Sequence, residues 1–197
     1  TYSDLGFILL TELVETISRK NFGEFCLSRI FNPLATVNTF FVAPTGPVCS
    51  LPAKDRVYAA TEDDQWRGRV LFGEVHDENA YVLGGIAGHA GLFSTASDVL
   101  NIVREYGAAV RGEGRILRAD LARLCITRQK QVLDSTRALG WDTPSDVSSS
   151  GRYFSDQSFG HLGFTGTSIW VDPIMDLIVV LLTNRVHPSR ANERIRE

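Results

Sequence analysis

The sequence contains very little lysine. Only Lys20, Lys54 and Lys130 are lysines among the 20 basic residues of this 197-residue chain. Acidic residues number 23, which gives a net charge of −3, and the arginines are scattered rather than clustered. A basic surface of the kind that binds nucleic acid is therefore excluded, and we expect no nucleic-acid partner.

Cysteine and long apolar runs are also scarce. The three cysteines, Cys26, Cys49 and Cys125, are too few and too far apart for a disulfide framework or a cysteine-based zinc site. The longest apolar run, Leu177–Leu182, has the length of a strand, so we expect no membrane-spanning segment in this chain. The polar start Thr1–Asp4 is not that of a signal peptide and leaves the compartment open.

The composition that is present is globular, with 44% hydrophobic and 22% charged residues. The spacing of apolar residues predicts helices over residues 4–20, 22–31, from 94–98 onward, and 118–125. The first of these is apolar on most sides, which favours burial, and Ser3 or Asp4 can cap it. Thr95 and Asp98 resemble a capping box at the start of the third helix.

Strands are predicted late in the chain, on either side of a turn at Asp172-Pro173. The second strand is apolar on both faces, as a central strand would be. The predicted strands span residues 165–171 and 176–183, the predicted loops residues 42–64, 70–93 and 142–160, and a last helix is predicted from Pro188. Helices first and a hairpin late favour an α+β fold.

The stretch His161-Leu162-Gly163-Phe164-Thr165-Gly166-Thr167 is the most specific chemical signal. It places a histidine and two closely spaced glycines at the entrance to the predicted hairpin. Glycines there allow close approach of a ligand to the strand edge, whose N–H groups are good oxyanion donors. An ordinary glycine-rich strand entry is the alternative interpretation.

Together with its surroundings, this stretch resembles the serine β-lactamase and penicillin-binding-protein superfamily, in its class C-like esterase and carboxypeptidase branch. That superfamily uses Ser-x-x-Lys, Tyr-x-Asn and Lys-Thr-Gly motifs. His161-Leu162-Gly163 stands where Lys-Thr-Gly would be, and Tyr2-Ser3-Asp4 where Tyr-x-Asn would be. Residues 85–95 resemble the family's glycine-rich loop, and residues 169–184 its final hairpin.

The resemblance implies a β-lactamase/transpeptidase-like α+β fold that is incomplete here. Residues 1–150 would form a mostly helical subdomain beginning at the Tyr motif. Residues 151–197 would add the C-terminal strands of an antiparallel sheet and the start of the final helix.

The resemblance also assigns roles to individual residues. Tyr2 would move a proton to or from the nucleophile, and the Phe164 N–H would be one of two oxyanion donors. His161 would replace the lysine beside the substrate and, unlike lysine, can be neutral at pH 7. Asp4, Gly163 and Thr165 would contact the substrate, although an ionised Asp4 can only accept hydrogen bonds where the family's asparagine also donates.

The family's nucleophile is absent. Ser-x-x-Lys places a serine one helical turn before its lysine, but Ile17, Leu51 and Thr127 stand three residues before the three lysines. We therefore expect the chain to be the C-terminal part of a longer serine hydrolase and to be inactive alone. Its missing N-terminal segment would then be a partner, because a sheet lacking strands exposes an edge and an apolar face.

The substrate would be a small ester, β-lactam or D-Ala peptide, with weak β-lactamase turnover because His161 replaces lysine. No cofactor is expected. The resemblance favours the periplasm or secretion, and a cytoplasmic location stays open.

Two alternatives remain at this point. A penicillin-binding fold without its nucleophile can be a ligand-binding or sensor module. Glu74, His76, Asp77, Glu78 and His89 crowd the glycine-rich segment, but their spacing matches no zinc motif, so we expect no metal.

Overall fold

The computed structural model describes residues 3–43, 46–48, 56–146 and 148–192. The chain folds as two compact units, each with its own internal packing. The first comprises residues 1–98 and 184–197, and the second residues 99–183. The boundary predicted at residue 150 was drawn where helical sequence gives way to strand-rich sequence, and it differs from the boundary between the two compact units. It stays a prediction.

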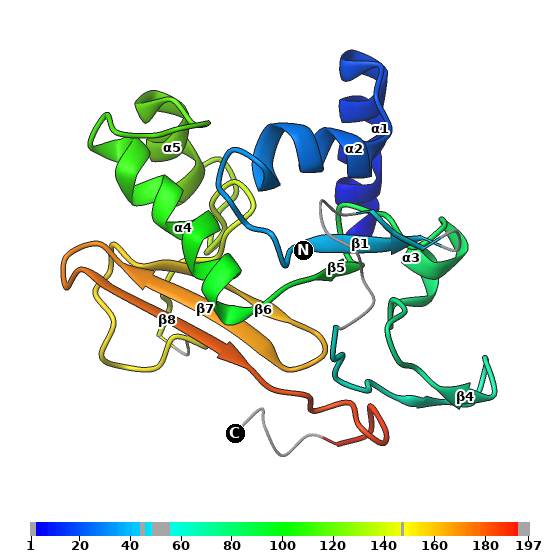
Figure 1. The fold of residues 1–197 in the computed structure, drawn as a ribbon. Helices are drawn as coiled ribbons and strands as arrows, with labels where there is room; N and C mark the ends of the chain where they lie inside the picture. Colours follow the sequence, from blue (N-terminus) through cyan, green and yellow to red (C-terminus); the bar gives the residue numbers. More distant parts are fainter. Residues whose placement is uncertain (1–2, 44–45, 49–55, 147, 193–197) are drawn as a thin grey trace. The chain divides into compact units, whose positions relative to one another are not determined.

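Three helical segments open the first unit, drawn in blue in Figure 1. They are α1 (Asp4–Ser18), α2 (Phe22–Cys26) and a wider π-type turn η1 (Leu27–Phe31), close to the predicted spans. Helix α1 ends at Arg19, whose left-handed backbone returns its N–H to the Glu15 carbonyl. Asn21 then caps α2 by accepting a hydrogen bond from the Gly23 N–H.

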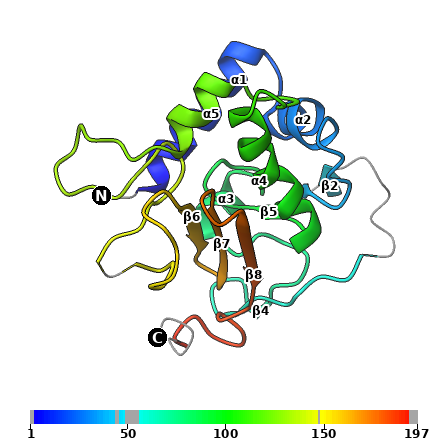
Figure 2. The same cartoon turned by 90° about the vertical axis from the view of Figure 1, so that its left-hand side faces the viewer.

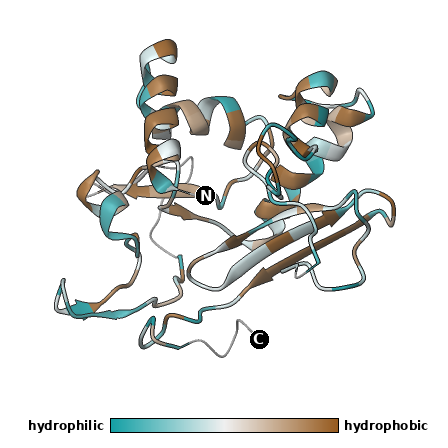
Figure 3. Cartoon of the chain, turned by 180° about the vertical axis from the view of Figure 1, so that it is seen from behind, coloured by the Kyte–Doolittle hydropathy of each residue, from teal (hydrophilic) through white to brown (hydrophobic). Residues whose placement is uncertain are grey.

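The predicted burial of α1 is wrong in this chain. None of its residues is buried, and five large apolar side chains are between 51% and 74% exposed: Leu5, Leu9, Leu10, Leu13 and Ile17. Figure 3 shows the resulting hydrophobic colouring along the helix. The spacing was that of a helix covered on several sides, but no described residue of the first unit covers these side chains.

Short strands complete the first unit. Strand β1 (Phe40–Ala43) pairs antiparallel with β2 (Gly46–Val48) and with β5 (Leu92–Phe93). A second ladder joins β3 (Asp63–Asp64) to β4 (Arg69–Val70), and α3 (Glu78–Val82) follows. The predicted loop over residues 42–64 therefore contains strand pairing, which the local prolines concealed.

The second unit is two helices on a three-stranded antiparallel sheet (Figures 1 and 2). Its elements are α4 (Ala96–Val110, of which residues 96–98 belong to the first unit), α5 (Ala119–Ile126), β6 (Phe159–Gly163), β7 (Thr167–Asp172) and β8 (Leu177–Leu182). Val103 of α4 packs in one core cluster with Phe159 and Val171 of the sheet. This core fixes the β6–β7 hairpin against α4, and the predicted helix and strand positions are confirmed to within a few residues.

Only one of the two hydrogen bonds of the capping box predicted at the start of α4 is formed. The Asp98 N–H donates to the Thr95 hydroxyl at 3.3 Å, as in such a box. The Asp98 carboxylate instead accepts from the Asn38 N–H and the Thr39 hydroxyl. It therefore joins the start of α4 to the segment before β1.

Two predictions about the last part of the chain are wrong. Strand β8 lies at the edge of the described sheet, where Leu177, Val179, Leu181 and Leu182 are between 38% and 49% exposed, so it is not a covered central strand here. The described residues from Pro188 to Asn192 form turns rather than a helix.

Candidate active-site hairpin

The turn between β6 and β7 carries the motif that resembles Lys-Thr-Gly. Antiparallel pairing sets His161 opposite Ile169 and Gly163 opposite Thr167. The Gly166 N–H donates to the Gly163 carbonyl at 3.0 Å and closes the turn. Phe164 lies in this turn and is 54% exposed. His161, Gly163, Phe164 and Thr165 therefore lie at the turn of a hairpin that the sequence did not predict, because residues 159–163 form a strand of their own before the two predicted ones.

Gly163 packs closely against the paired strand. A Cβ atom at this position would lie 2.1 Å from the Thr167 hydroxyl oxygen on the paired strand. Gly160 is confined by backbone, because a Cβ there would lie 2.3 Å from the Ile169 carbonyl oxygen. The glycines of β6 thus allow β7 to approach closely, a role that the sequence prediction did not include.

His161 is hydrogen-bonded to Arg137, which sequence reasoning missed. A guanidinium N–H of Arg137 donates to His161 Nε2 at 3.2 Å, and His161 Nδ1 lies 2.7 Å from the Leu162 carbonyl oxygen. Arginine can only donate and a carbonyl can only accept. Arg137 therefore places a guanidinium directly beside the His161 ring.

Arg137 reaches the hairpin because the chain returns along β6. The Asp142 and Gly160 backbones exchange hydrogen bonds of 2.7 and 2.9 Å, and Arg137 pairs with Asp142 across a tight turn. Asp142 also places a carboxylate 3.9 Å from the Arg137 guanidinium. Because this pairing joins residues that lie far apart in the sequence, no local pattern signals it.

The other end of β7 is held by a buried carboxylate. Asp172 accepts hydrogen bonds from the Ser155 N–H at 2.6 Å and hydroxyl at 2.8 Å, and from the Ile174 and Met175 N–H groups. Burial raises the pKa of the Asp172 carboxyl, but these hydrogen bonds outweigh burial and lower its pKa to about 2. Asp172 is therefore ionised at neutral pH and fixes the β7–β8 turn.

The Tyr-motif side of the predicted site belongs to the first unit. Tyr2 lies outside the described residues. Asp4 is the first residue of α1 and is partly exposed, and Ser3 stands at the N-cap without a capping side-chain hydrogen bond. Asp4 thus places a negative charge at the positive end of the helix dipole, where it is favourable.

The acidic and histidine residues around α3 bind one another. His76 Nε2 donates to the Glu62 carboxylate at 2.8 Å, and His89 Nε2 donates to Asp77 at 2.9 Å. Glu62 is buried and also accepts from Arg190. Among the described residues, no cluster has the three ligands that a metal site needs. These side chains act as structural pairs.

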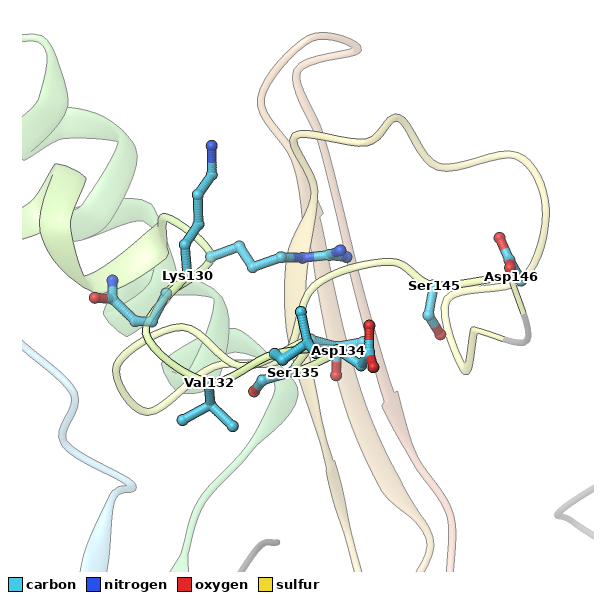
Figure 4. Close-up of a pocket in the computed structure, with 10 residues that line it drawn as sticks. Lys130, Val132, Asp134, Ser135, Ser145 and Asp146 are labelled. Carbon is cyan, nitrogen blue, oxygen red and sulfur yellow. The ribbon is translucent and has the colours of Figure 1, made fainter.

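The nearest sequence match to Ser-x-x-Lys is not a catalytic pair. Thr127 ends α5, and its hydroxyl donates to the Arg123 carbonyl. Lys130 lies on the following loop, at an open surface hollow of about 440 Å³ that Ser135 and Ser145 also line. In Figure 4 the Lys130 side chain extends away from both serines.

Sequence comparison decides the family. The family described as Beta-lactamase matches residues 1–197. The chain belongs to the serine β-lactamase and penicillin-binding-protein superfamily. A protein of Escherichia coli strain K12, whose provisional name is D-alanyl-D-alanine carboxypeptidase, is 30% identical over 97% of this chain and 46% of its own length.

Solved structures of the superfamily share the fold. A β-lactamase from Mycobacterium bovis is 25% identical, with a TM-score of 0.62 over 94% of this chain and 56% of the other. A penicillin-binding protein from Bacillus halodurans matches the fold at 20% identity and a TM-score of 0.62, over 93% of this chain and 51% of the other. The α+β fold of the β-lactamase/transpeptidase type is therefore confirmed.

The chain spans about half the length of the curated relatives that it matches. In the part of the chain that the structure describes, no helix has both the length and the apolarity needed to cross a bilayer.

Proposed function

We propose that this chain supplies the Tyr motif and the oxyanion hairpin of a serine hydrolase whose nucleophile lies outside residues 1–197. The observation that carries the proposal is the β6–β7 hairpin, which presents Phe164 at its turn and His161 beside Arg137. The absence of Ser-x-x-Lys and the half-length match to the relatives support an external nucleophile. The chain alone would be inactive.

The proposed reaction passes through an acyl-enzyme. The serine attacks a carbonyl carbon, and Tyr2 takes the serine proton and passes it to the leaving group. The Phe164 N–H donates to the oxyanion that forms, while Asp4, Gly163 and Thr165 line the substrate. Water then hydrolyses the acyl-enzyme through a second oxyanion.

The proposed substrates are esters and D-Ala peptides rather than β-lactams. The E. coli relative's name supports the peptide class. The histidine at position 161, where the family has lysine, supports slow β-lactam turnover. Comparing nitrocefin with p-nitrophenyl acetate tests this, and efficient nitrocefin hydrolysis with weak ester turnover would contradict it.

The apolar side chains that α1 and β8 expose support an upstream segment of the same protein that would pack against them. If such a segment covered α1, the apolar residues on most sides of this helix would be buried, as its sequence pattern predicts.

A covalent probe tests the proposal as a whole. The full natural protein is treated with a fluorophosphonate or a labelled penicillin, and the labelled peptide is located by mass spectrometry. The proposal predicts a labelled serine outside residues 1–197. A label on a residue within this chain contradicts the external nucleophile, and no label at all favours a ligand-binding or sensor module.

A further inference from the structure

The glycine-rich loop of residues 83–91 follows α3 and folds back over it. Ala87 of the loop lies in one buried cluster with Ala80 of α3. A Cβ atom at Gly91 would lie 2.5 Å from the Gly85 carbonyl oxygen, so the two ends of the loop approach each other closely. The loop is therefore a closed turn packed on a helix of the first unit.

A buried histidine anchors this loop to the start of α3. His89 Nε2 donates to the Asp77 carboxylate at 2.9 Å, and the His89 side chain is only 1% exposed. The same Asp77 oxygen caps α3 by accepting a hydrogen bond from the Ala80 N–H at 2.8 Å. Within the described residues, the other ring nitrogen of His89, Nδ1, is buried without a hydrogen-bond partner. The bond to Asp77 is therefore the polar contact that fixes the His89 ring.

The next residue on the other side of His89 contacts α1. The Gly88 N–H donates to the Thr11 hydroxyl at 2.9 Å, and this hydroxyl donates to the Phe7 carbonyl at 2.9 Å. A Cβ atom at Gly88 would lie 2.6 Å from the Thr11 hydroxyl oxygen and 2.9 Å from the Phe7 carbonyl oxygen, so only glycine allows this approach. Both contacts fall in the N-terminal half of α1, the helix that directly follows the Tyr motif in the sequence.

We propose that Asp77 and His89 position α1, and with it the Tyr motif, by holding the glycine-rich loop against this helix. The inference rests on the proposed function, in which the Tyr motif moves the proton of the acylation step. His89 is a positioning residue because its buried ring acts through the neighbouring Gly88 and not on the substrate.

Turnover of p-nitrophenyl acetate by the full natural protein tests the role of His89. His89→Ala should lower kcat about tenfold and change KM by less than about twofold, since a displaced proton-transfer group slows the chemical step without removing a substrate contact. His89→Gln, whose amide can still donate to Asp77, should recover most of the loss. Unfolding curves set a temperature at which every variant is folded. An unchanged kcat in His89→Ala, or a loss that His89→Gln does not recover, overturns the inference.

A double-mutant cycle tests the path through α1. Thr11→Val removes the hydroxyl that accepts from the Gly88 N–H at nearly constant shape, whereas Thr11→Ser keeps it. Thr11→Val should lower kcat and Thr11→Ser should not. Because His89→Ala and Thr11→Val would break the same path, the double variant should be little slower than the slower single variant. Losses that multiply would overturn this path.

Arg69→Gln is the matched control in the same unit. Arg69 donates two hydrogen bonds to Glu74, at 2.8 and 2.9 Å, close in sequence to Asp77, and its side chain is 51% exposed. This variant should keep the kcat and KM of the natural sequence. A fall in kcat as large as that of His89→Ala would overturn the specific role of the loop anchor.

Hydrogen exchange separates the inference from the proposed function. In the full natural protein, His89→Ala should speed exchange of the α1 amides several-fold, measured by mass spectrometry on peptides from residues 4–18, and leave α5 unchanged. Faster α1 exchange in a protein without ester turnover would support the hold on α1 and refute the hydrolase. Ester turnover together with unchanged α1 exchange would leave the hydrolase standing and overturn the inference.

Discussion

The two compact units each hold a histidine hydrogen-bonded to a charged residue, but the two pairs differ in exposure. His76 and Glu62 lie buried in the first unit, and Arg190 closes the cluster over Glu62. His161 and Arg137 lie partly exposed in the second unit, at the end of a hairpin. The buried pair directs its polar groups into the fold, whereas the exposed pair leaves the Arg137 side chain 42% exposed.

Burial also explains how the acidic and histidine residues around α3 are engaged with one another. A buried carboxylate must be satisfied by the protein, and Glu62 accepts hydrogen bonds from His76 and from both backbone and side chain of Arg190. Burial raises the pKa of Glu62, but these contacts outweigh it and lower the pKa overall. A group so fully engaged has little capacity left for a metal or substrate.

The largest expected effect comes from breaking the buried pair. Glu62→Ala should lower the free energy of unfolding by about 3 kcal/mol, because His76 and Arg190 lose the buried carboxylate to which they donate hydrogen bonds. Denaturant unfolding measures the loss. A change within experimental error would mean that the cluster does not stabilise the first unit.

Asp172→Asn is the next largest change, expected to cost about 2 kcal/mol because the amide presents a donor to N–H groups that need an acceptor. The pH dependence follows from the sign of the shift. The pKa of Asp172 is lowered from 3.8 to about 2, so its stabilisation is complete above pH 4 and is lost as the pH falls toward 2.

Unfolding curves at several pH values between 4 and 2 check this. The natural sequence should lose stability across that window, and Asp172→Asn should show a flatter profile there. Parallel profiles for the two proteins would contradict the assignment of the low pKa to Asp172.

Gly163→Ala tests the close packing of the hairpin by a double-mutant cycle. The added methyl group meets the Thr167 hydroxyl, so we expect a cost of about 1–2 kcal/mol of stability. Thr167→Ala should relieve most of it in the double variant. If the stability losses of Gly163→Ala and Thr167→Ala simply add in the double variant, the contact between these two positions does not explain the glycine.

Glu113→Gln is the smallest expected change and the matched control for Glu62. Glu113 pairs with Arg111 on the surface, with both side chains more than 60% exposed. Exposed ion pairs contribute little, so the change should stay below about 0.5 kcal/mol. A loss comparable with that of Glu62→Ala would mean that burial is not what separates the two pairs.

Local pattern predicted much of the fold. Apolar spacing located α1, α4 and α5, and strand-like runs on either side of a turn located the last two strands, because each signal lies within one element. The motif around His161 precedes the first predicted strand, as expected, but its strand β6 was not predicted. The identity of the fold required the resemblance to a family in addition.

Long-range pairing could not be predicted. Arg137 reaches His161 through a turn that pairs with β6, and Glu62 meets Arg190 across most of the chain. The strand β1 lies beside prolines that locally favour a loop. Whether α1 and β8 are covered depends on what packs against them, which their own sequences do not contain.

The rate of covalent labelling of the full natural protein tests most directly whether the hairpin pair acts on substrate. For His161→Ala we predict a second-order labelling rate by a labelled penicillin about tenfold or more below that of the natural sequence, since the proposed function places His161 beside the substrate and loss of an orienting group slows the reaction of a bound substrate. The free energy of unfolding of the same variant should change by less than about 1 kcal/mol. An unchanged labelling rate would contradict the account and return His161 to a purely structural role.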